Sequence, residues 1–418
     1  MRKTSINSKK QYDVIIAGGG LAGLTMAARI GSAGMDVLVV EREAQAKMTS
    51  TAFDGRTTAI AYGSTKILDA CGVWQKIKDS TCPIDDIRVA DQRSALTLDF
   101  ESKDVFVRDA SALSGATGPA SGDTAFGYIV ENTVFRTALF ERLAELKNVR
   151  LACPVTIQDI HYEEDGVTLA LDDGSMPCAK LLIAADGKKS FCREHAGIKA
   201  RHWSYNETAL VVTIKHTKPH GNLALEYFYP GGPFAVLPMS DNRSSIVWTE
   251  RPDTAQALST MPESEFIGLL KARGCDTLGE ISLVTPRQQY PLRFMLADCL
   301  HSTRLALIGE AAHSMHPVAG QGFNLSVRDI GVLGDLVEMR FKAGDEVGAD
   351  ELLQRYDAGR QLDHFTFMTA TDILVKLFSN NVLPLRLVRR FGLALIEKIP
   401  PAKKFFSRMA MGLLSQGK

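Results

Sequence analysis

The sequence predicts an α/β fold: a discontinuous Rossmann-type nucleotide-binding domain, interleaved with a mixed or antiparallel β-sheet domain and followed by C-terminal helices. Three observations predict it. A strand, a glycine-rich loop, a helix and a second strand fill residues 12–41. Two further buried-strand patterns end at residues 187 and 309, and residues 205–250 between them carry aromatic and β-branched runs typical of sheet. Since one core stops growing at roughly 250–300 residues, we expect the 418 residues to form two sub-domains.

The expected domain boundaries follow from where these patterns change along the chain. The nucleotide-binding domain takes three segments, the β-sheet domain takes two, and a helical tail ends the chain: residues 12–81, 125–198 and 293–362, then 82–124 and 199–292, and finally 363–418. A chain that leaves a domain and returns to it twice implies that the second domain is an insertion.

The elements are expected in a fixed order, because apolar residues recur every three or four positions in helices and run together in buried strands. We expect strands at 12–17 and 36–41 around a helix at 24–32, sheet at 82–100, a loop at 115–123, an amphipathic helix at 135–146, a buried strand at 180–187, sheet at 205–250, a helix at 262–274 and a buried strand at 304–309. Gly274 is placed where a helix commonly ends.

Bulk composition excludes several classes of protein. Lys and Arg total 48, as do Asp and Glu, so no overall positive field points to nucleic acid. The seven cysteines form no CxxC pair, which favours buried thiols in a reduced compartment over disulfides or a zinc site. No signal-peptide core follows the basic N-terminus, and no apolar run reaches the ~18–20 residues of a membrane span. We expect a cytoplasmic protein, and peripheral binding to the inner face of the membrane stays open.

The stretch GGGLAG follows the first strand and opens a helix, the context of a dinucleotide-binding loop. Gly18 permits the tight turn, Gly20 lets the backbone approach a pyrophosphate, and Gly23 lets the helix pack closely on the strand. The free N–H groups of the helix N-terminus favour phosphates. Glu41 ends the second strand, where its carboxylate can accept both ribose hydroxyls. A chance glycine-rich turn is the alternative, and the motif alone does not separate NAD from FAD.

Two later motifs also follow buried strands. The pair Asp186-Gly187 in AADG is by itself most simply a turn. The stretch GEAAHSMHPVAGQGFNL, at 309–325, is rich in glycine and lies between a buried strand and a helix-like pattern. Such a loop is suited to wrap around a ligand, and a helix N-terminus in it favours an anion. His313 and His316 are three residues apart, but no further ligand cluster accompanies them, so we expect no metal site.

Four motifs in order resemble those of the class A flavoprotein monooxygenases, and most of all the ubiquinone-biosynthesis hydroxylases. They are GGGLAG, GRTTAIAYGSTKILDACGVW at 55–74, AADGKKS at 184–190 and GEAAHSMHPVAGQGFNLSVRD at 309–329, and the resemblance covers roughly residues 12–365. It implies an extended FAD, with its ADP end on the first strand–helix–strand unit and its flavin at the boundary with the substrate domain. It also implies hydroxylation of an aromatic, polyprenylated phenol or quinone precursor by O₂ through a flavin C4a-hydroperoxide, with NAD(P)H as transient reductant.

The resemblance assigns roles to individual residues. Glu310 stands where the family usually has an aspartate that holds the ribityl hydroxyls, and it is one methylene longer. The residues implied to surround the reactive flavin, without any acid–base triad, are Pro317, Gly320 and Gln321. The residues implied to bind FAD are Gly18, Gly20, Leu21, Ala22, Gly23, Glu41, Arg42, Arg56, Asn132, Asp186, Gly309, Glu310, Gly320, Gln321, Gly322, Phe323 and Asn324. Arg56 would lie near the pyrophosphate. Asn132 would touch the ribityl chain, and a helix N-cap is an equally good interpretation of it.

The last part of the chain is basic and apolar. Residues 373–418 hold nine Lys or Arg against one acid, Glu397, and apolar residues separate the charges. This pattern predicts amphipathic helices on an anionic membrane surface, and helices packed on the protein or on a second subunit are the alternative. Because all flavin motifs precede the tail, we expect a chain cut after Gln361 to keep FAD.

Two other functions fit the same motifs. One is a different reaction on the same scaffold, as in an epoxidase, a halogenase or a prenyl reductase. The other is a flavin-stabilised scaffold protein in a membrane-associated biosynthetic assembly. A homo-oligomer or a biosynthetic complex is compatible with either, and we expect no nucleic acid partner.

Overall fold

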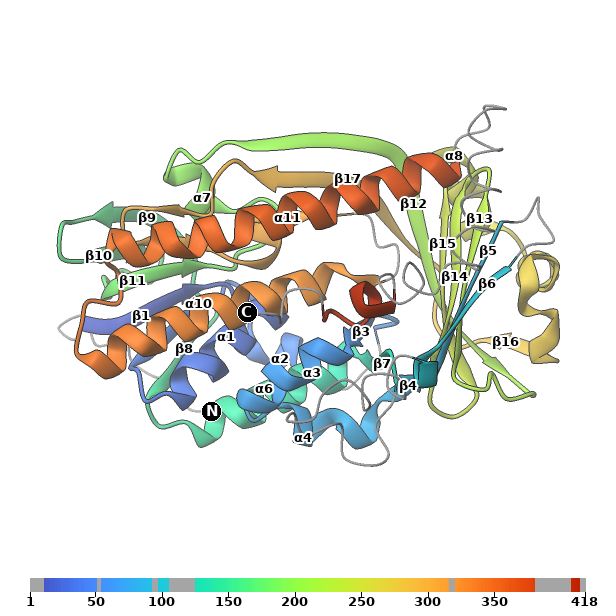
Figure 1. The fold of residues 1–418 in the computed structure, drawn as a ribbon, viewed down its shortest axis with the longest axis horizontal. Helices are drawn as coiled ribbons and strands as arrows, with labels where there is room; N and C mark the ends of the chain where they lie inside the picture. Colours follow the sequence, from blue (N-terminus) through green and yellow to red (C-terminus); the bar gives the residue numbers. More distant parts are fainter. Residues whose placement is uncertain are drawn as a thin grey trace.

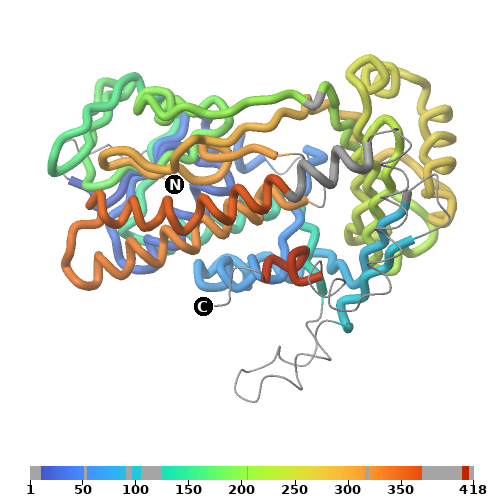
Figure 2. Tube along the Cα trace, turned by 45° about the horizontal axis from the view of Figure 1, so that its top comes forward, coloured from blue at the N-terminus to red at the C-terminus, as the bar shows by residue number. Residues whose placement is uncertain are grey.

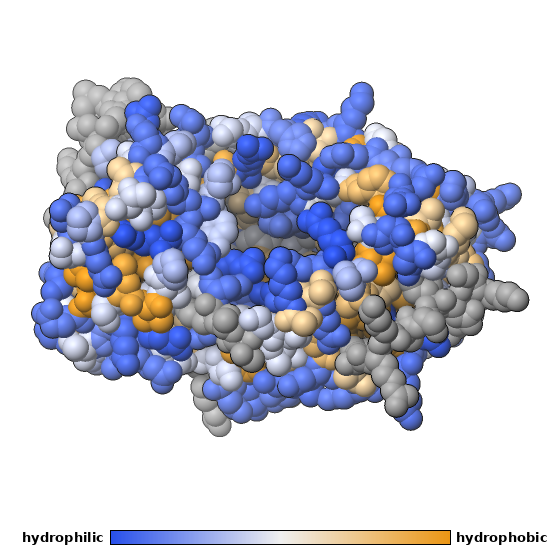
Figure 3. Space-filling view, turned by 180° about the vertical axis from the view of Figure 1, so that it is seen from behind, coloured by the Kyte–Doolittle hydropathy of each residue, from blue (hydrophilic) through white to orange (hydrophobic). Residues whose placement is uncertain are grey.

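The structure is a computed structural model that describes residues 11–50, 54–91, 97–104, 125–315, 320–379 and 407–413. An α/β part and a large, mostly antiparallel sheet lie side by side along the long axis of the molecule (Figure 1). The opposite face of the molecule is hollowed near its centre, and hydrophilic side chains form most of the rim (Figure 3).

The α/β part is built on a sheet with the strand order β18-β19-β11-β1-β2-β8, and β10 and β9 extend it from β11. Strands β19, β11, β1, β2 and β8 are parallel to one another, and their apolar runs are buried on both faces. The strands are β1 (Gln11–Ala17), β2 (Val37–Val40), β8 (Val149–Ala152), β9 (Ile157–Tyr162), β10 (Val167–Leu171), β11 (Cys178–Ala184), β18 (His301–Ser302) and β19 (Leu305–Leu307).

Helices cover this sheet and pack on one another. Helix α1 contacts both α6 and α10, and the long helix α11 lies against α10 (Figures 1 and 2). The helices of this part are α1 (Leu21–Ser32), α2 (Gln45–Met48), α3 (Tyr62–Ala70), α4 (Trp74–Ile77), α6 (Asn132–Glu145), α7 (Phe191–His195), α10 (Gly322–Ala343) and α11 (Asp350–Ser379). Two short 3₁₀ turns, at Lys78–Ser80 after α4 and at Gly309–Ala311 after β19, also belong to this part.

The second sheet has the order β20-β17-β12-β15-β14-β13-β5-β6, with β16 beside β12. Its neighbours are antiparallel except β5 and β13, which are parallel. The strands are β5 (Asp86–Asp91), β6 (Thr97–Glu101), β12 (Ala200–His216), β13 (Leu223–Tyr229), β14 (Gly232–Met239), β15 (Arg243–Glu250), β16 (Ile281–Leu283), β17 (Gln288–Ala297) and β20 (His313–Ser314). Helices α8 (Pro252–Thr260) and α9 (Glu263–Leu270) pack on one face, followed by turns at Lys271–Cys275 and Asp276–Leu278.

A small three-stranded sheet lies between the two parts. It has the order β3-β7-β4, from β3 (Thr57–Ala61), β7 (Gly127–Glu131) and β4 (Cys82–Ile84). Its apolar residues pack against the other face of the large sheet and against residues 407–413, which include a short helical turn. We call this group the inter-sheet cluster; its buried members are Ile84, Leu98, Phe100, Phe126, Ile129, Ala224, Phe228, Met239 and Met411.

The expected elements that lie within the described residues are confirmed in type and order. The parallel strands at 12–17, 36–41, 180–187 and 304–309 correspond to β1, β2, β11 and β19, and the helix expected at 135–146 is α6. The proposed division at residue 362 falls inside α11, and the division at residue 292 falls inside β17. The expected loop at 115–123 lies outside the described residues.

Residues 407–413 pack on the protein rather than standing apart from it. Gly63 donates its N–H to the carbonyl of Met411 at 2.8 Å, and the Met411 side chain is fully buried. Within the part of the chain that the structure describes, no helix combines the length and the apolar character needed to cross a membrane.

Candidate functional site

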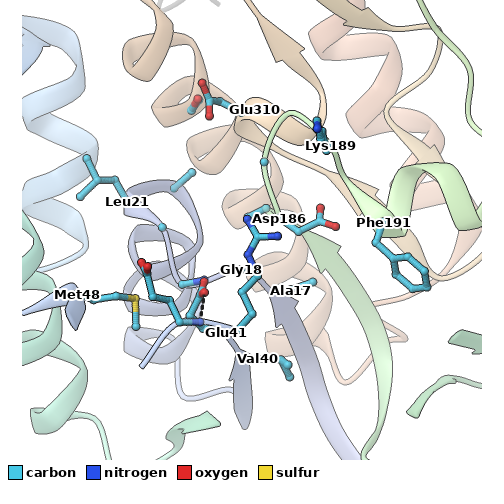
Figure 4. A pocket seen from close by; sticks show the side chains of 18 of the residues that line it. Ala17, Gly18, Leu21, Val40, Glu41, Met48, Asp186, Lys189, Phe191 and Glu310 are labelled. Atoms are coloured by element: carbon cyan, nitrogen blue, oxygen red, sulfur yellow. Dashed lines mark hydrogen bonds between the residues drawn. The ribbon is translucent and has the colours of Figure 1, made fainter. Parts of the chain in front are cut away.

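A cavity of about 690 Å³ opens where the parallel strands end. It is lined by the ends of β1, β2 and β11, by the N-terminus of α1 and by the start of α10 (Figure 4). Ligands of α/β sheets bind at this edge, because the loops after the strands and the helix N-termini converge there. The following predicted residues line it: Gly18, Gly20, Leu21, Ala22, Glu41, Arg42, Arg56, Asn132, Asp186, Glu310, Gly322 and Phe323.

The glycine-rich loop fits a pyrophosphate. A Cβ atom on Gly23 would lie 2.0 Å from the carbonyl oxygen of Gly18, so glycine is needed for α1 to pack this closely on the loop. A Cβ atom on Gly20 would meet nothing within 4 Å, which leaves open space in front of the backbone. No side chain caps the N-terminus of α1, and its first turn holds no acid. Its free N–H groups therefore remain available to a phosphate.

Glu41 lies over this loop at the end of β2. Its Oε2 accepts the N–H of Gly19 at 2.6 Å, and its Oε1 accepts the N–H of Glu43 at 2.7 Å. Each carboxylate oxygen has two lone pairs, so both retain capacity for a further donor. The carboxylate is thus fixed in direction at the cavity wall, as a residue that binds two ribose hydroxyls requires.

Arg56 reaches the cavity from the start of β3 and is held by Asp54. Its Nε and Nη2 donate to Asp54 Oδ2 at 2.9 and 2.6 Å, and Arg136 approaches the same oxygen at 3.3 Å. Burial raises the pKa of Asp54, but the bonds from Arg56 outweigh it and the net pKa is lowered, so this carboxylate stays charged. Arg42, Arg136 and Lys189 also line the cavity, and this group of cations suits a diphosphate.

Asn132 is the first residue of α6, and its side chain does not cap the helix. The N-cap position is Glu131, and no side chain makes a cap hydrogen bond there. Asn132 Oδ1 instead accepts a hydrogen bond from Thr58 Oγ1 at 2.6 Å. Of the two interpretations, a helix cap is wrong, and a polar group at the cavity wall stays a prediction.

Asp186 has a structural task as well as a place in the cavity. One oxygen accepts Ser190 Oγ at 2.5 Å, and the other accepts the N–H of Cys192 at 3.1 Å. These bonds hold the start of α7 against the end of β11. The pKa of the Cys192 thiol lies well above its usual range, mainly because the thiol is buried and also because the negative charge of Asp186 is close to it.

Gly309 packs against the start of α1, and Glu310 lies at the cavity wall. A Cβ atom on Gly309 would lie 3.1 Å from Ala22 Cβ, which shows how closely the two segments approach. Glu310 is 59% exposed, and its Oε1 lies 3.3 Å from Lys188 Nζ. The longer acid therefore reaches the cavity with its carboxylate free for further bonds.

The predicted flavin loop, the stretch at 309–325 that is expected to wrap around the flavin, is only partly at the cavity. Gly322 and Phe323 line the cavity, whereas Gly320, Gln321 and Asn324 do not. Gly309 and Gly23 lie behind the cavity wall, where they let the backbone pack closely. Pro317 and His316 lie outside the described residues.

Asn324 is buried, and both ends of its side-chain amide are hydrogen-bonded to the protein. Its Oδ1 accepts from Ala61 N and Ser64 Oγ at 2.8 Å each, and its Nδ2 donates to the carbonyls of Ala59 and Gly320. Its side chain therefore fixes the loop to β3 and α3.

Gln321 connects the loop to the end of the chain. Its Nε2 donates to the carbonyl of Ala410 at 3.2 Å, and its Oε1 is buried without a partner among the described residues. A chain cut after Gln361, expected from the sequence to keep FAD, would therefore lose a direct contact to the predicted flavin loop, and its FAD binding stays a prediction.

A buried polar network behind the cavity was missed by the sequence analysis. Asp329 on α10 accepts His313 Nε2 on one oxygen at 2.7 Å, and His364 Nε2 and Arg360 Nε on the other at 2.7 and 2.8 Å. The same carboxylate accepts the N–H of Gly309 at 3.4 Å. Burial raises the pKa of Asp329, but the surrounding cations and imidazoles hold it well below its usual range. The sequence motif ending at Asp329 gave a signal for this residue, but nothing in it pointed to Arg360 or His364.

The imidazoles and the carboxylate of this network could in principle hold a metal ion, since their ligand atoms lie within 4.8 Å of one another. Both Asp329 oxygens already accept hydrogen bonds, and Arg360 places a fixed positive charge beside them. A divalent cation would have to displace these donors and tolerate that charge, so we interpret the cluster as a support for the loop.

The sequence model of the FAD binding domain family matches residues 11–364. The chain belongs to this FAD-binding family. It is 40% identical to the ubiquinone hydroxylase UbiL of Rhodospirillum rubrum over 98% of this chain and 92% of that protein. It is 31% identical to the 3-demethoxyubiquinol 3-hydroxylase of Escherichia coli, over 96% of this chain and 98% of that protein.

Solved structures share the fold of this FAD-binding family member. The p-nitrophenol 4-monooxygenase PnpA of Pseudomonas putida matches with a TM-score of 0.76, over 96% of this chain and 98% of that one, at 19% identity. The family match and the hydroxylase relatives together show that the chain is an FAD-dependent monooxygenase by family. The open space before Gly20, the uncapped α1 and the fixed Glu41 fit FAD at the cavity on the geometry alone.

Proposed function

We propose that the protein hydroxylates an aromatic ring of a polyprenylated phenol or quinone precursor in ubiquinone biosynthesis. The observation that carries the proposal is the 40% identity to a ubiquinone hydroxylase along nearly the whole of both chains. Such extended similarity includes the large sheet as well as the cofactor motifs, so it also covers the part of the molecule that we propose as the substrate domain. O₂ and a reductant, NAD(P)H by family, are the co-substrates.

The chain's own residues bind and orient the cofactor. Backbone N–H groups of α1 and the cations Arg42 and Arg56 would hold the pyrophosphate, and Glu41 the adenosine ribose. Asn132 and Glu310 would bind the ribityl chain. Bound flavin supplies the redox chemistry, taking electrons from the reductant and activating O₂.

The predicted flavin loop has a separate role. We propose that the backbone from Gly320 to Phe323, with Pro317 before it, borders the reactive ring. Since α10 begins at Gly322, its N-terminus would favour negative charge on the flavin edge. Asn324 and the Asp329 network would act through this loop by keeping its backbone in one place.

The substrate and its setting are proposed from the same reasoning. The apolar inter-sheet cluster lies between the large sheet and the cofactor part, where a ring could be kept from water. We also propose that the basic residues of 373–418 hold the protein at an anionic membrane surface, near a lipid-soluble substrate. Contact with a second copy or a biosynthetic complex is the competing use of this segment.

Turnover tests the proposal directly. Purified FAD-loaded protein should oxidise NAD(P)H and consume O₂ in a manner dependent on a short-chain prenylated phenol, and ¹⁸O₂ should label the product. The intermediate that accumulates in a deletion strain would identify the ring carbon. Binding of FAD and of the phenol with no O₂ uptake under any reductant would instead favour the scaffold function.

The membrane part of the proposal has its own measurement. Intact protein should float with vesicles of anionic lipid at low salt and less so at high salt, because charges are screened over about 10 Å at 0.1 M salt. No flotation at low salt would contradict a role at the membrane surface and leave the hydroxylase proposal untouched.

A further inference from the structure

Glu226 lies in the middle of β13, on the face of the large sheet that is turned toward the cofactor part. Side chains alternate along a strand. Leu225, Tyr227 and Tyr229 pack in the cluster under α8 and α9, whereas Ala224 and Phe228 pack in the inter-sheet cluster. Glu226 stands between Ala224 and Phe228 and therefore shares their face.

The strand neighbours of Glu226 are apolar. Its direct neighbours across the sheet are Val89 on β5 and Ala235 on β14, and β14 has no ionisable side chain. No described residue donates a hydrogen bond to Glu226 or forms an ion pair with it, and its side chain is half-buried. The ionisable residues of the adjoining strands are Arg88 and Asp99, bonded to each other, Glu131, bonded to Arg243, Tyr227 and Tyr229 on the opposite face, Asp86 and Asp91 at the ends of β5, Glu101 at the end of β6, and Cys82 and Tyr128 on the three-stranded sheet. Helix α11, which also packs on β13 and β14, holds Asp372 and Lys376, and residues 407–413 hold Arg408.

The face that carries Glu226 is linked to the predicted flavin loop by residues 407–413. Met411 is a buried member of the inter-sheet cluster together with Ala224 and Phe228. The preceding residue, Ala410, accepts the side-chain hydrogen bond of Gln321 at 3.2 Å. If the ring binds at the inter-sheet cluster, as proposed above, it meets the face that carries Glu226, and residues 407–413 connect this face to the predicted flavin loop.

The state of the carboxyl group is unusual. Burial alone raises the pKa of Glu226 to about 8. An apolar setting with no partner destabilises the carboxylate, which gains from any ligand that donates a hydrogen bond to it. A phenol, whose own pKa is near 10 as in tyrosine, is such a donor. An acid and a base this close in pKa exchange a proton readily.

We propose that Glu226 is a catalytic residue that binds the phenolic hydroxyl of the substrate and takes its proton during hydroxylation. This inference rests on the proposed function, because it assumes a phenolic ring. The phenol O–H bond breaks, a carboxyl O–H bond forms, and the electron pair stays on the oxygen as phenolate. The electron-rich ring is then more reactive toward electrophilic oxygen, and the proton returns to solvent after turnover.

The test of binding uses two ligands that differ by one group: a short-chain prenylated phenol and its methyl ether, with binding followed by the flavin absorbance of the FAD-loaded protein. Above about pH 8, where the Glu226 carboxyl is ionised, wild type should bind the phenol about tenfold to a hundredfold more tightly, the usual effect of one charge-assisted hydrogen bond. Glu226→Leu should bind both alike while keeping its flavin and its thermal stability. Equal binding of the two ligands by wild type would overturn the inference.

The test of proton transfer uses Glu226→Gln, which keeps the shape but cannot take the proton. In wild type, phenol-dependent NAD(P)H oxidation should rise as pH passes the pKa of Glu226, and this rise should be absent in Glu226→Gln. Glu280→Gln, at an exposed side chain bonded to Lys271, is the matched control and should behave as wild type.

The two tests separate this inference from the proposed function. If wild type hydroxylates the phenol and Glu226→Gln keeps the same pH profile, the inference is overturned and the function stands. If wild type distinguishes phenol from ether through Glu226 but hydroxylates neither, the binding site stands and the proposed function fails.

Discussion

Two glycines of one loop provide a matched pair of substitutions with opposite expected effects. In Gly23→Ala the new Cβ would lie 2.0 Å from the carbonyl oxygen of Gly18 and 3.3 Å from Ala185 Cβ. In Gly20→Ala the new Cβ would meet nothing within 4 Å, and the backbone at φ −72° and ψ 179° suits any residue. The first change should disturb the fold, and the second should disturb only the cofactor.

The magnitudes follow from these distances. Contacts under 3.0 Å are essentially never made by real Cβ atoms, so α1 must move from the loop by about 1 Å in Gly23→Ala. Forcing extra volume into a packed site costs about 1–3 kcal/mol. In Gly20→Ala, a weaker N-cap and a less flexible unfolded chain offset each other, so stability should change by less than about 1 kcal/mol. Its FAD affinity should fall by about tenfold or more, since the methyl group takes the space the pyrophosphate needs.

The assay measures the two effects separately. Urea unfolding of the apoprotein, followed by tryptophan fluorescence, gives the free energy of unfolding, and titration with FAD gives the affinity. Gly20→Val should carry the loss of affinity further. If Gly20→Ala binds FAD as wild type does, the loop is not the pyrophosphate site. If Gly23→Ala unfolds at the wild-type urea concentration, α1 does not pack on the loop as described.

Three further predictions follow from the site. Glu310→Ala should weaken FAD binding by roughly tenfold to a hundredfold, through loss of charge-assisted bonds, and Glu310→Asp only slightly; equal losses in a fluorescence titration would contradict its role. Asp329→Asn should lower the free energy of unfolding by about 3–5 kcal/mol, against less than about 1 for the exposed Asp335→Asn. Because its folded pKa is lowered, the contribution of Asp329 is present above its unfolded pKa and lost as pH falls toward the folded one. A chain cut after residue 361 loses His364 and residues 407–413, so it should be poorly folded and poor in flavin; full flavin content in its spectrum would refute this.

The cofactor part of the fold was predictable because its signals are local. Gly18, Gly20 and Gly23 act within one turn of chain, and the buried strands are short apolar runs whose meaning does not depend on distant residues. The position of Glu41 at the end of the second strand was predicted from the first strand–helix–strand unit alone; its bond to Gly19 is a finding of the structure, and its contact with a ribose stays a prediction. Such patterns predict an element correctly when the residues within that element are enough to determine its structure.

The remaining features depend on residues far apart in the chain. His313, Asp329 and His364 meet only because α10 and α11 pack together, and no spacing in the sequence announces that contact. In the sequence, Glu226 is an ordinary acidic residue within a strand. Only the register of β5, β13 and β14 shows that its neighbours on the adjacent strands are apolar. The alternative interpretation of Asn132 as a helix cap was wrong for the same reason, since its partner Thr58 lies on β3, far from it in the sequence.

The C-terminal segment shows why sequence order is a poor guide to what supports a site. Residues 407–413 come after every flavin motif, yet they pack tightly against Gly63. A Cβ atom on Gly63 would lie 2.6 Å from the carbonyl oxygen of Gly412, so glycine is needed for this close approach. This close approach places Ala410 within reach of Gln321 and Met411 in the inter-sheet cluster. One short segment therefore contacts the predicted flavin loop and the apolar face that carries Glu226. Because a change in its position would move both walls of the proposed ring site together, cofactor binding and substrate binding are expected to be coupled through it.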